Sequence, residues 1–184
     1  MTMNRRYVTA LLAMLALMTS WVASAADEPA AYVPTVLVTG ANRGIGLELA
    51  RQYAATGWNV IGTARKPAES TELNALAAAS SGRVTVEALD VMDLAAIDAL
   101  AAKYAGKPVD ILFNNAGVTG GGENQQFAKN MKWELFDVVH RTNVVGPLKM
   151  AEAFLPNLLA GQQKKISNVS SSQGLLAPTP VSPG

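Results

Sequence analysis

The stretch Thr39-Gly40-Ala41-Asn42-Arg43-Gly44-Ile45-Gly46 follows the apolar run Thr35–Val38 and precedes the helical pattern Leu47–Tyr53. A strand, a glycine-rich turn and a helix in that order make a phosphate site largely from backbone atoms. Glycines let the main chain take left-handed dihedrals and let a pyrophosphate approach without an intervening Cβ. The helix N-terminus adds unpaired N–H groups and a partial positive charge. We therefore predict a dinucleotide site formed by Thr39, Gly40, Asn42, Arg43, Gly44, Ile45 and Gly46.

The N-terminal residues 1–25 have the pattern of an export signal. Arg5 and Arg6 precede an apolar core, Val8–Met18, and a small-residue cleavage site, Ala23-Ser24-Ala25. The apolar core is too short to span a bilayer, so we expect no stable membrane span after cleavage and an exported, periplasmic protein. The alternative is a mis-assigned start codon upstream of a cytoplasmic protein.

Composition narrows the classes of partner and site. Removing residues 1–25 takes two of the 15 basic residues and none of the 14 acidic ones, which leaves a formal charge of −1. No basic cluster favours nucleic acid, so none is expected as a partner. The chain has no cysteine and one histidine, which excludes disulfides and thiolate metal sites, and we expect no metal.

After a linker at residues 26–34, strand-like and helix-like segments alternate through residues 35–184, one domain. Several of the strand-like runs are almost continuously apolar, as in a sheet that is buried on both faces. The predicted strands are Thr35–Thr39, Asn59–Thr63, Val84–Leu89, Val109–Asn114 and Lys165–Ser170. The predicted helices are 45–56, 69–80, 93–105 and roughly 131–160, the last bent or locally opened by Gly146-Pro147. This order predicts an α/β fold, a doubly wound parallel sheet (Rossmann fold) with strand order 3-2-1-4-5.

The end of the second strand favours NADP(H) over NAD(H). An acidic residue there would hold the ribose 2′-OH of NAD(H), but the strand is followed by Ala64-Arg65-Lys66. The Arg65 guanidinium suits a 2′-phosphate, and Arg43 in the glycine turn adds a second positive charge.

Three more strand ends carry residues that suit a nucleotide site. Asp90, with Val91, ends the third strand in position to accept a hydrogen bond from an adenine amino group. Asn114, Ala116 and Gly117 end the fourth strand, where small residues and amides line a ribose. Ser170–Gly174 ends the fifth. Carboxyl ends of parallel strands meet at one edge, so these segments are expected to share a crevice.

Taken together, these segments resemble the classical short-chain dehydrogenase/reductase family. The matching pieces are TGANRGIG at Thr39–Gly46, Asp90-Val91, NNAG at Asn114–Gly117, Asn143 in Arg141–Val144, and ISNVSSSQG at Ile166–Gly174. The resemblance covers about residues 35–176, and Thr142–Leu148 and Thr63–Arg65 are similar to the NADPH-dependent carbonyl-reductase branch.

The resemblance implies an oxidoreductase that transfers hydride between NADP(H) and a small-molecule carbonyl or alcohol substrate. In the family, a serine polarises the carbonyl oxygen and an asparagine supports a proton relay; they map onto Ser171 and Asn143 as the catalytic residues. The resemblance also makes a homo-oligomer of this chain possible.

The sequence departs from the family pattern in one respect. The family's Tyr-x-x-x-Lys pair, which moves the proton, is expected to begin near position 184, where Pro183-Gly184 stand. The tyrosines are Tyr7, Tyr32, Tyr53 and Tyr104, and no lysine follows Lys165. The expectation is a Rossmann domain truncated before this pair and lacking strands six and seven. The alternative to an active enzyme is therefore a catalytically weak or dead NADP(H)-binding remnant.

Overall fold

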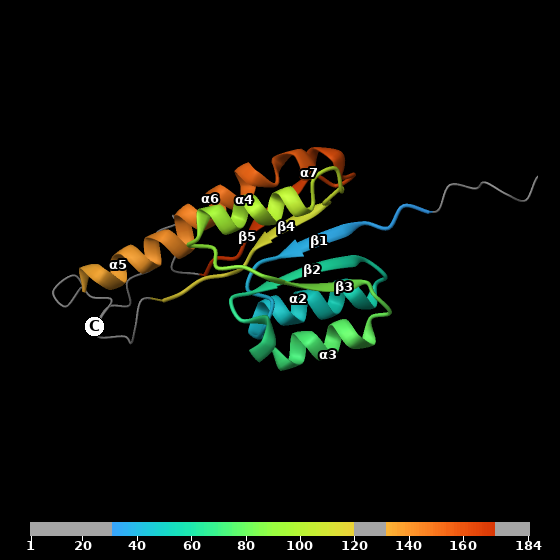
Figure 1. Ribbon diagram of the computed structural model, residues 1–184, viewed down its shortest axis with the longest axis horizontal. Helices are drawn as coiled ribbons and strands as arrows, with labels where there is room; N and C mark the ends of the chain where they lie inside the picture. Colours follow the sequence, from blue (N-terminus) through green and yellow to red (C-terminus); the bar gives the residue numbers. More distant parts are fainter. Residues whose placement is uncertain (1–30, 120–131, 172–184) are drawn as a thin grey trace, which may run out of the picture. The chain divides into compact units, whose positions relative to one another are not determined.

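Apolar runs at five places in the chain form the strands of one parallel sheet. The computed structural model describes residues 31–119 and 132–171, and the strands lie in the order β3-β2-β1-β4-β5 (Figure 1). They are β1 (Thr35–Val38), β2 (Asn59–Ala64), β3 (Val84–Ala88), β4 (Ile111–Asn114) and β5 (Lys165–Asn168). All four neighbouring pairs are parallel. The predicted fold class and strand order are confirmed, and the strand ends differ from the predicted ones by at most two residues.

The helices connect these strands. They are α2 (Gly44–Ala55), the 3-10 turn η1 (Pro67–Glu69), α3 (Thr71–Ala79), α4 (Leu94–Lys103), α5 (Trp133–His140), the π-helical segment η4 (Arg141–Val145), α6 (Gly146–Ala153) and α7 (Leu155–Ala160). Contacts divide the chain into two units, Met1–Tyr32 and Val33–Gly184, and the sheet belongs to the second. The predicted signal peptide, linker residues 26–30 and residues 172–184 lie outside the described residues. No helix in the described ranges is long and apolar enough to cross a membrane.

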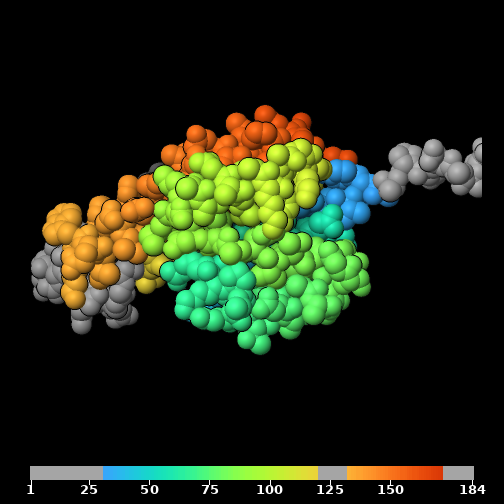
Figure 2. All heavy atoms as spheres, viewed as in Figure 1, coloured from blue at the N-terminus to red at the C-terminus, as the bar shows by residue number. Residues whose placement is uncertain are grey.

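Both faces of the sheet are covered over the central strands β1, β2 and β4, which explains their near-continuous apolar sequence, whereas the edge strands β3 and β5 are partly exposed. Side chains alternate between the faces, so Val36 and Val38 pack on one side and Leu37 on the other. Helices α2 and α3 cover the first face, where the buried residues include Leu47, Ala50 and Leu73. Helices α4, α6 and α7 cover the second face with Ile97, Met150 and Phe154. Figure 2 shows the atoms of α4 directly beside the orange atoms of α6 and α7.

The predicted single helix over residues 131–160 is wrong in detail. It is divided into α5, η4, α6 and α7. The predicted local opening is present, as the π-helical turn that ends directly before Gly146-Pro147. Pro147 has no N–H to donate to the carbonyl four residues earlier. The preceding Gly146 N–H instead donates to the Arg141 carbonyl, five residues back, which is the π-helical pattern. The predicted helix 69–80 corresponds to α3, whose ends differ from the predicted ones by two residues and one residue; the short turn η1 precedes it.

A buried carboxylate ties three strands together at the amino end of the sheet. Asp110 is fully buried; its Oδ2 accepts the Thr35 N–H at 2.8 Å, and its Oδ1 accepts the N–H groups of Gln162 and Gln163 at 2.7 and 3.2 Å. These residues lie at or just before the starts of β1, β4 and β5. Asp110 therefore stabilises the edge of the sheet opposite the strand ends that were predicted to bind a ligand.

A second buried carboxylate joins β3 to the end of α4. Glu87 Oε1 accepts the Tyr104 hydroxyl hydrogen at 2.7 Å, and both Glu87 oxygens lie 2.7 Å from Lys103 Nζ. Burial, and then the hydrogen bond with Glu87, raise the pKa of the Tyr104 hydroxyl above its ordinary value. The neutral phenol is thus the form that the folded protein holds.

Candidate functional site

The glycine turn between β1 and α2 has the geometry that a phosphate site needs. Gly40 and Gly44 have φ of +66° and +57°, the left-handed region that glycine adopts without strain. A Cβ on Gly44 would meet nothing within 4 Å, so this position faces open space. A Cβ on Gly46 would collide with the Gly40 carbonyl and the Asn115 side chain. Gly44 therefore leaves room for a ligand, whereas Gly46 allows α2 to pack closely on the turn.

The first turn of α2 is open to a ligand. Arg43 precedes the helix and its side chain makes no capping hydrogen bond. The first N–H groups of a helix have no partner within it, and they carry a partial positive charge. In this position they suit an anion in front of Gly44.

Asn115 and Thr39 hold the glycine turn in place. Asn115 Nδ2 donates to the carbonyls of Thr39 and Gly40 at 2.9 and 3.1 Å. Thr39 Oγ1 accepts the N–H groups of Asn115 and Ala116, both at 3.0 Å. Thr39 is 1% exposed, so its role here is to join the ends of β1 and β4 rather than to contact a ligand. The sequence does not indicate that Asn115 holds the glycine turn, because these hydrogen bonds depend on two strand ends meeting.

A cleft of about 300 Å³ lies in front of the turn, at the carboxyl ends of β1, β2, β3 and β4. Most of the predicted cofactor-binding residues line it together: Gly40, Asn42, Arg43, Gly44, Ile45, Arg65, Asp90, Val91, Ala116 and Gly117. Thr39 and Gly46 lie behind the turn and support it.

The two arginines face the same end of this cleft. At this end Arg43 and Arg65 also line an adjoining pocket, together with Asn42, Lys66, Glu69, Ser70 and Asp90. Within residues 31–119 and 132–171, neither guanidinium has a hydrogen bond or an ion pair with another residue. Two guanidinium groups in one pocket, neither of them in an ion pair with a described carboxylate, suit a phosphate.

Asp90 accepts two hydrogen bonds from backbone N–H groups of the loop that follows it. Its Oδ1 accepts the Met92 N–H at 3.0 Å, and its backbone carbonyl accepts the Asp93 N–H at the same distance. The half-buried side chain still lines the cleft beside buried Val91. Its second carboxylate oxygen suits a hydrogen-bond donor of a bound base.

A second cleft adjoins the first and contains both predicted catalytic residues. Asn143, from η4, and Ser171, which follows β5, line it together with Gly117, Val118 and Pro147. Asn143 Oδ1 accepts the Val118 N–H at 2.9 Å and its Nδ2 donates to the Val118 carbonyl at 2.8 Å. Asn143 therefore fixes the backbone at the boundary of the two clefts.

Asn114 lies deeper than its neighbours. It is 5% exposed, and its Nδ2 donates to Asn168 Oδ1 at 2.9 Å and to the Pro147 carbonyl at 3.3 Å. Its Oδ1 is the one buried side-chain polar atom in the described part of the chain without a hydrogen-bond partner. The side chain bridges β4, β5 and α6, and it lines the second cleft but not the first.

These features fit two different phosphate groups of a bound dinucleotide. The open position at Gly44 and the uncapped start of α2 fit the pyrophosphate. The unpaired Arg43 and Arg65 fit the additional phosphate of NADP(H).

Comparisons with known proteins agree with this geometry. A family model described as short chain dehydrogenase matches residues 34–183. The chain is 36% identical over 171 residues to (+)-neomenthol dehydrogenase of Arabidopsis thaliana, with 82% of this chain and 57% of that protein covered. It is 34% identical over 157 residues to the NADPH-dependent pterin aldehyde reductase of the same plant, with 81% and 61% covered.

Among solved structures, the chain is similar to a short-chain dehydrogenase/reductase from Burkholderia multivorans with bound NADP. The TM-score is 0.71 at 33% identity, and the match covers 82% of this chain and 64% of that one. The chain thus spans less than two thirds of the length of each of these three proteins.

Proposed function

Because the chain belongs to the short-chain dehydrogenase family, we propose that it binds NADP(H) and serves hydride transfer between that cofactor and a carbonyl or alcohol carbon. The observation that carries the proposal is the shared cleft of the glycine turn, Arg43 and Arg65. The bound NADP of the Burkholderia structure and the NADPH named for the pterin aldehyde reductase support this choice of cofactor.

The preference for NADP(H) over NAD(H) rests on the charges at the end of β2. No acid stands in Ala64-Arg65-Lys66 to accept the ribose 2′-OH of NAD(H). A 2′-phosphate would instead meet the guanidinium groups of Arg43 and Arg65, which lack protein partners among the described residues. Charge-assisted hydrogen bonds are about twice as strong as neutral ones, so the phosphate is the favoured ligand.

The cofactor supplies the hydride at its nicotinamide ring, and the protein supplies position and polarity. The second cleft is the proposed place for the small-molecule substrate, because it adjoins the cofactor cleft at Gly117 and Val118. There the Ser171 hydroxyl is proposed to polarise the substrate oxygen. Asn143 holds the Val118 backbone and so keeps the wall between the two clefts in place. A small-molecule carbonyl or alcohol fits this site, and a homo-oligomer is compatible with it.

Binding is tested by titrating the folded protein with NADPH and NADH and following nucleotide fluorescence. We expect NADPH to bind at least about tenfold more tightly, since one hydrogen bond to a charged group contributes about 1.5–3 kcal/mol. Arg65→Gln should remove most of this preference. Arg83→Gln, an exposed arginine just before β3 and outside the cleft, is the matched control. Equal affinities for NADPH and NADH would refute the assignment of Arg65.

Turnover is tested separately, by following NADPH oxidation with a panel of aldehydes and ketones. Turnover that Ser171→Ala abolishes, with NADPH affinity unchanged, supports hydride transfer at this site. Tight NADPH binding without turnover by any substrate would support the nucleotide-binding remnant instead. Failure of well-folded protein to bind either nucleotide would overturn both.

We also propose that residues 1–25 direct export. The pattern of Arg5-Arg6, Val8–Met18 and Ala23-Ser24-Ala25 supports this. N-terminal sequencing of the protein from the producing cell should begin at Ala26, and a mature protein that begins near Tyr32 would rule the proposal out.

A further inference from the structure

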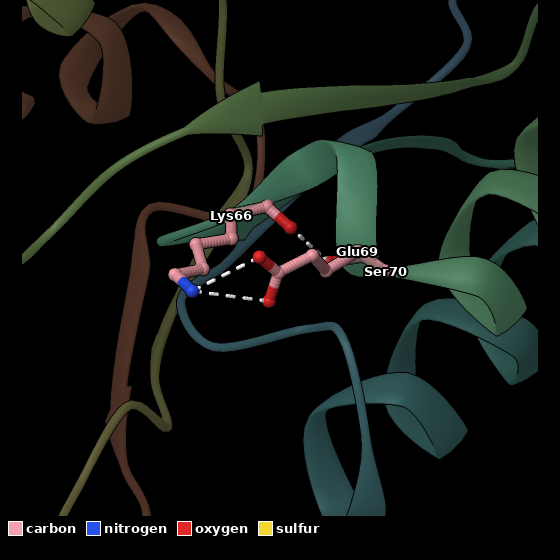
Figure 3. A network of polar contacts seen from close by, with 3 residues as sticks. All are labelled: Lys66, Glu69 and Ser70. Atoms are coloured by element: carbon pink, nitrogen blue, oxygen red, sulfur yellow. Dashed lines mark hydrogen bonds and ion pairs between the residues drawn. The ribbon is translucent and has the colours of Figure 1, made fainter.

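An ion pair stands beside the two arginines, at the end of the cleft assigned to the 2′-phosphate. Lys66 Nζ lies 2.9 and 3.2 Å from the two carboxylate oxygens of Glu69 (Figure 3). Both residues line the pocket that also contains Arg43 and Arg65. This pocket therefore has three cations, Arg43, Arg65 and Lys66, and two carboxylates, Asp90 and Glu69. Of these carboxylates, Glu69 is the one that forms an ion pair with a cation of the pocket.

The backbone that carries the pair is held in place. The Lys66 carbonyl accepts the Ser70 hydroxyl hydrogen at 2.9 Å and the Glu69 N–H at 3.1 Å. Asn74 Nδ2 donates to the Pro67 carbonyl at 2.8 Å, and Ser70 is only 4% exposed. The side chains of Lys66 and Glu69, in contrast, are 71% and 68% exposed. The turn is fixed while the two charged ends stand in water, where they can change partners.

We propose that Lys66 is a third cation for the 2′-phosphate of NADP(H), and that Glu69 is the counter-ion it exchanges for that phosphate. The inference rests on the proposed NADP(H) site and assigns two further residues to its specificity. On binding, the Lys66 ammonium turns from the Glu69 carboxylate toward the phosphate, and no covalent bond changes. Glu69 thereby moderates the affinity for NADP(H), whereas the affinity for NAD(H) does not depend on this pair.

The physical basis is competition between two anions for one ammonium group. A solvent-exposed ion pair is weak, so the pair is easily broken. A phosphate with close to two negative charges and three acceptor oxygens attracts the ammonium more strongly than a carboxylate does. The neutral 2′-OH of NAD(H) offers no such competitor, so Lys66 stays with Glu69. Releasing Lys66 from Glu69 in advance should therefore favour only the phosphorylated nucleotide.

The test uses the full chain and two probes that lack the nicotinamide half, adenosine 2′,5′-bisphosphate and adenosine 5′-monophosphate, with calorimetry as the readout. Lys66→Gln should weaken binding of the bisphosphate about 5- to 20-fold, the loss of one charge-assisted contact at an exposed site. Glu69→Gln should tighten it about 3- to 10-fold, because it frees Lys66 and removes a repelling charge. Binding of the monophosphate should stay within about twofold in both variants, since Lys66 keeps no contact with it.

Matched controls are available elsewhere on the surface. On α2, Glu48 forms an ion pair with Arg51, and these two residues are three positions apart in the chain, as Lys66 and Glu69 are. The side chains of Glu48 and Arg51 are each about half exposed. Lys165, on β5, is an exposed lysine outside all of the described clefts. Glu48→Gln and Lys165→Gln change the net charge by the same amounts and should leave both affinities unchanged.

The outcomes separate this inference from the proposed function. If wild-type protein binds neither probe nor NADPH, the nucleotide site itself is wrong. If wild-type protein binds the bisphosphate and the Lys66 and Glu69 variants do so equally well, the site stands and the exchange is refuted. A Glu69→Gln variant that binds the bisphosphate more weakly would also refute it.

Discussion

Replacing Gly44 by alanine separates the ligand-facing role of the glycine turn from its structural role. Gly44 has φ of +57°, lines the cleft, and has nothing within 4 Å of the position that a Cβ would take. In the free protein the new methyl group therefore meets no atom. In the bound protein it would stand where the pyrophosphate approaches the start of α2.

Two magnitudes follow from this geometry. An alanine in the left-handed region costs about 1–2 kcal/mol, partly offset by a less flexible unfolded chain, so the free energy of unfolding should fall by roughly 1 kcal/mol. The new methyl group should push the pyrophosphate away from the turn and so remove at least one of its hydrogen bonds, which makes the free energy of binding less favourable by about 1.5–3 kcal/mol. NADPH affinity should then fall about 10- to 100-fold.

The control is Gly82→Ala. Gly82 also has a positive φ, +83°, and also has nothing within 4 Å of its Cβ position, but it lies in the turn before β3, outside the cleft. Urea unfolding should show a similar loss of stability in both variants, while nucleotide fluorescence should show weaker NADPH binding only in Gly44→Ala. If Gly44→Ala bound NADPH as tightly as Gly82→Ala does, the phosphate would not lie at this turn.

Three further predictions concern residues that hold the fold and the cleft wall. Burial and Glu87 raise the pKa of the Tyr104 hydroxyl in the folded protein, so the contribution of the neutral phenol to the free energy of unfolding is complete below about pH 10 and is lost as the pH rises further. In urea unfolding, Tyr104→Phe should therefore flatten this alkaline decline and should lower the free energy of unfolding by about 0.5–1.5 kcal/mol at neutral pH. Asp110→Asn should lower the free energy of unfolding by about 2–4 kcal/mol, because an amide replaces one oxygen that accepts backbone N–H groups, while NADPH affinity of the folded protein stays within about twofold; a large loss of affinity would contradict its position at the opposite edge of the sheet. Asn143→Ala should weaken NADPH binding about 3- to 10-fold by releasing the Val118 backbone. Asn143→Asp, which places a carboxylate oxygen opposite the Val118 carbonyl, should weaken it at least as much, and unchanged binding in both variants would argue against this contact.

The sheet could be predicted from the sequence because its signal is local. A strand buried on both faces must be largely apolar, and a proline, glycine, asparagine or charged residue stands within two residues of each end of the first four strands. The order 3-2-1-4-5 then follows from the right-handed crossover and the alternation of strands and helices. Only the strand ends were displaced, where hydrogen bonding fades over one or two residues.

The interruption of the long helix was harder to place. Pro147 predicts a defect, because a proline removes a hydrogen bond. It does not say on which side the backbone yields, since the helix can kink at the proline or widen before it. The π-helical turn at Arg141–Val145 places Asn143 against the Val118 backbone, a contact between segments 25 residues apart. That contact favours widening before the proline and is not visible in local sequence.

The difference between local signals and contacts of distant segments also explains which site residues the sequence indicates. Gly44 and Arg65 are recognisable because their own chemistry, a missing Cβ or a guanidinium group, is what a phosphate needs at a strand end. Asn115 and Glu69 belong to residue types that are common at turns and on surfaces, so only their partners reveal them. Asn115 matters because it reaches the carbonyls of Thr39 and Gly40 across the sheet. Glu69 matters because the 3-10 turn η1 brings its carboxylate to the lysine beside Arg65. If that lysine helps to bind the 2′-phosphate, cofactor preference depends on the folded turn as well as on the basic residues that the sequence displays.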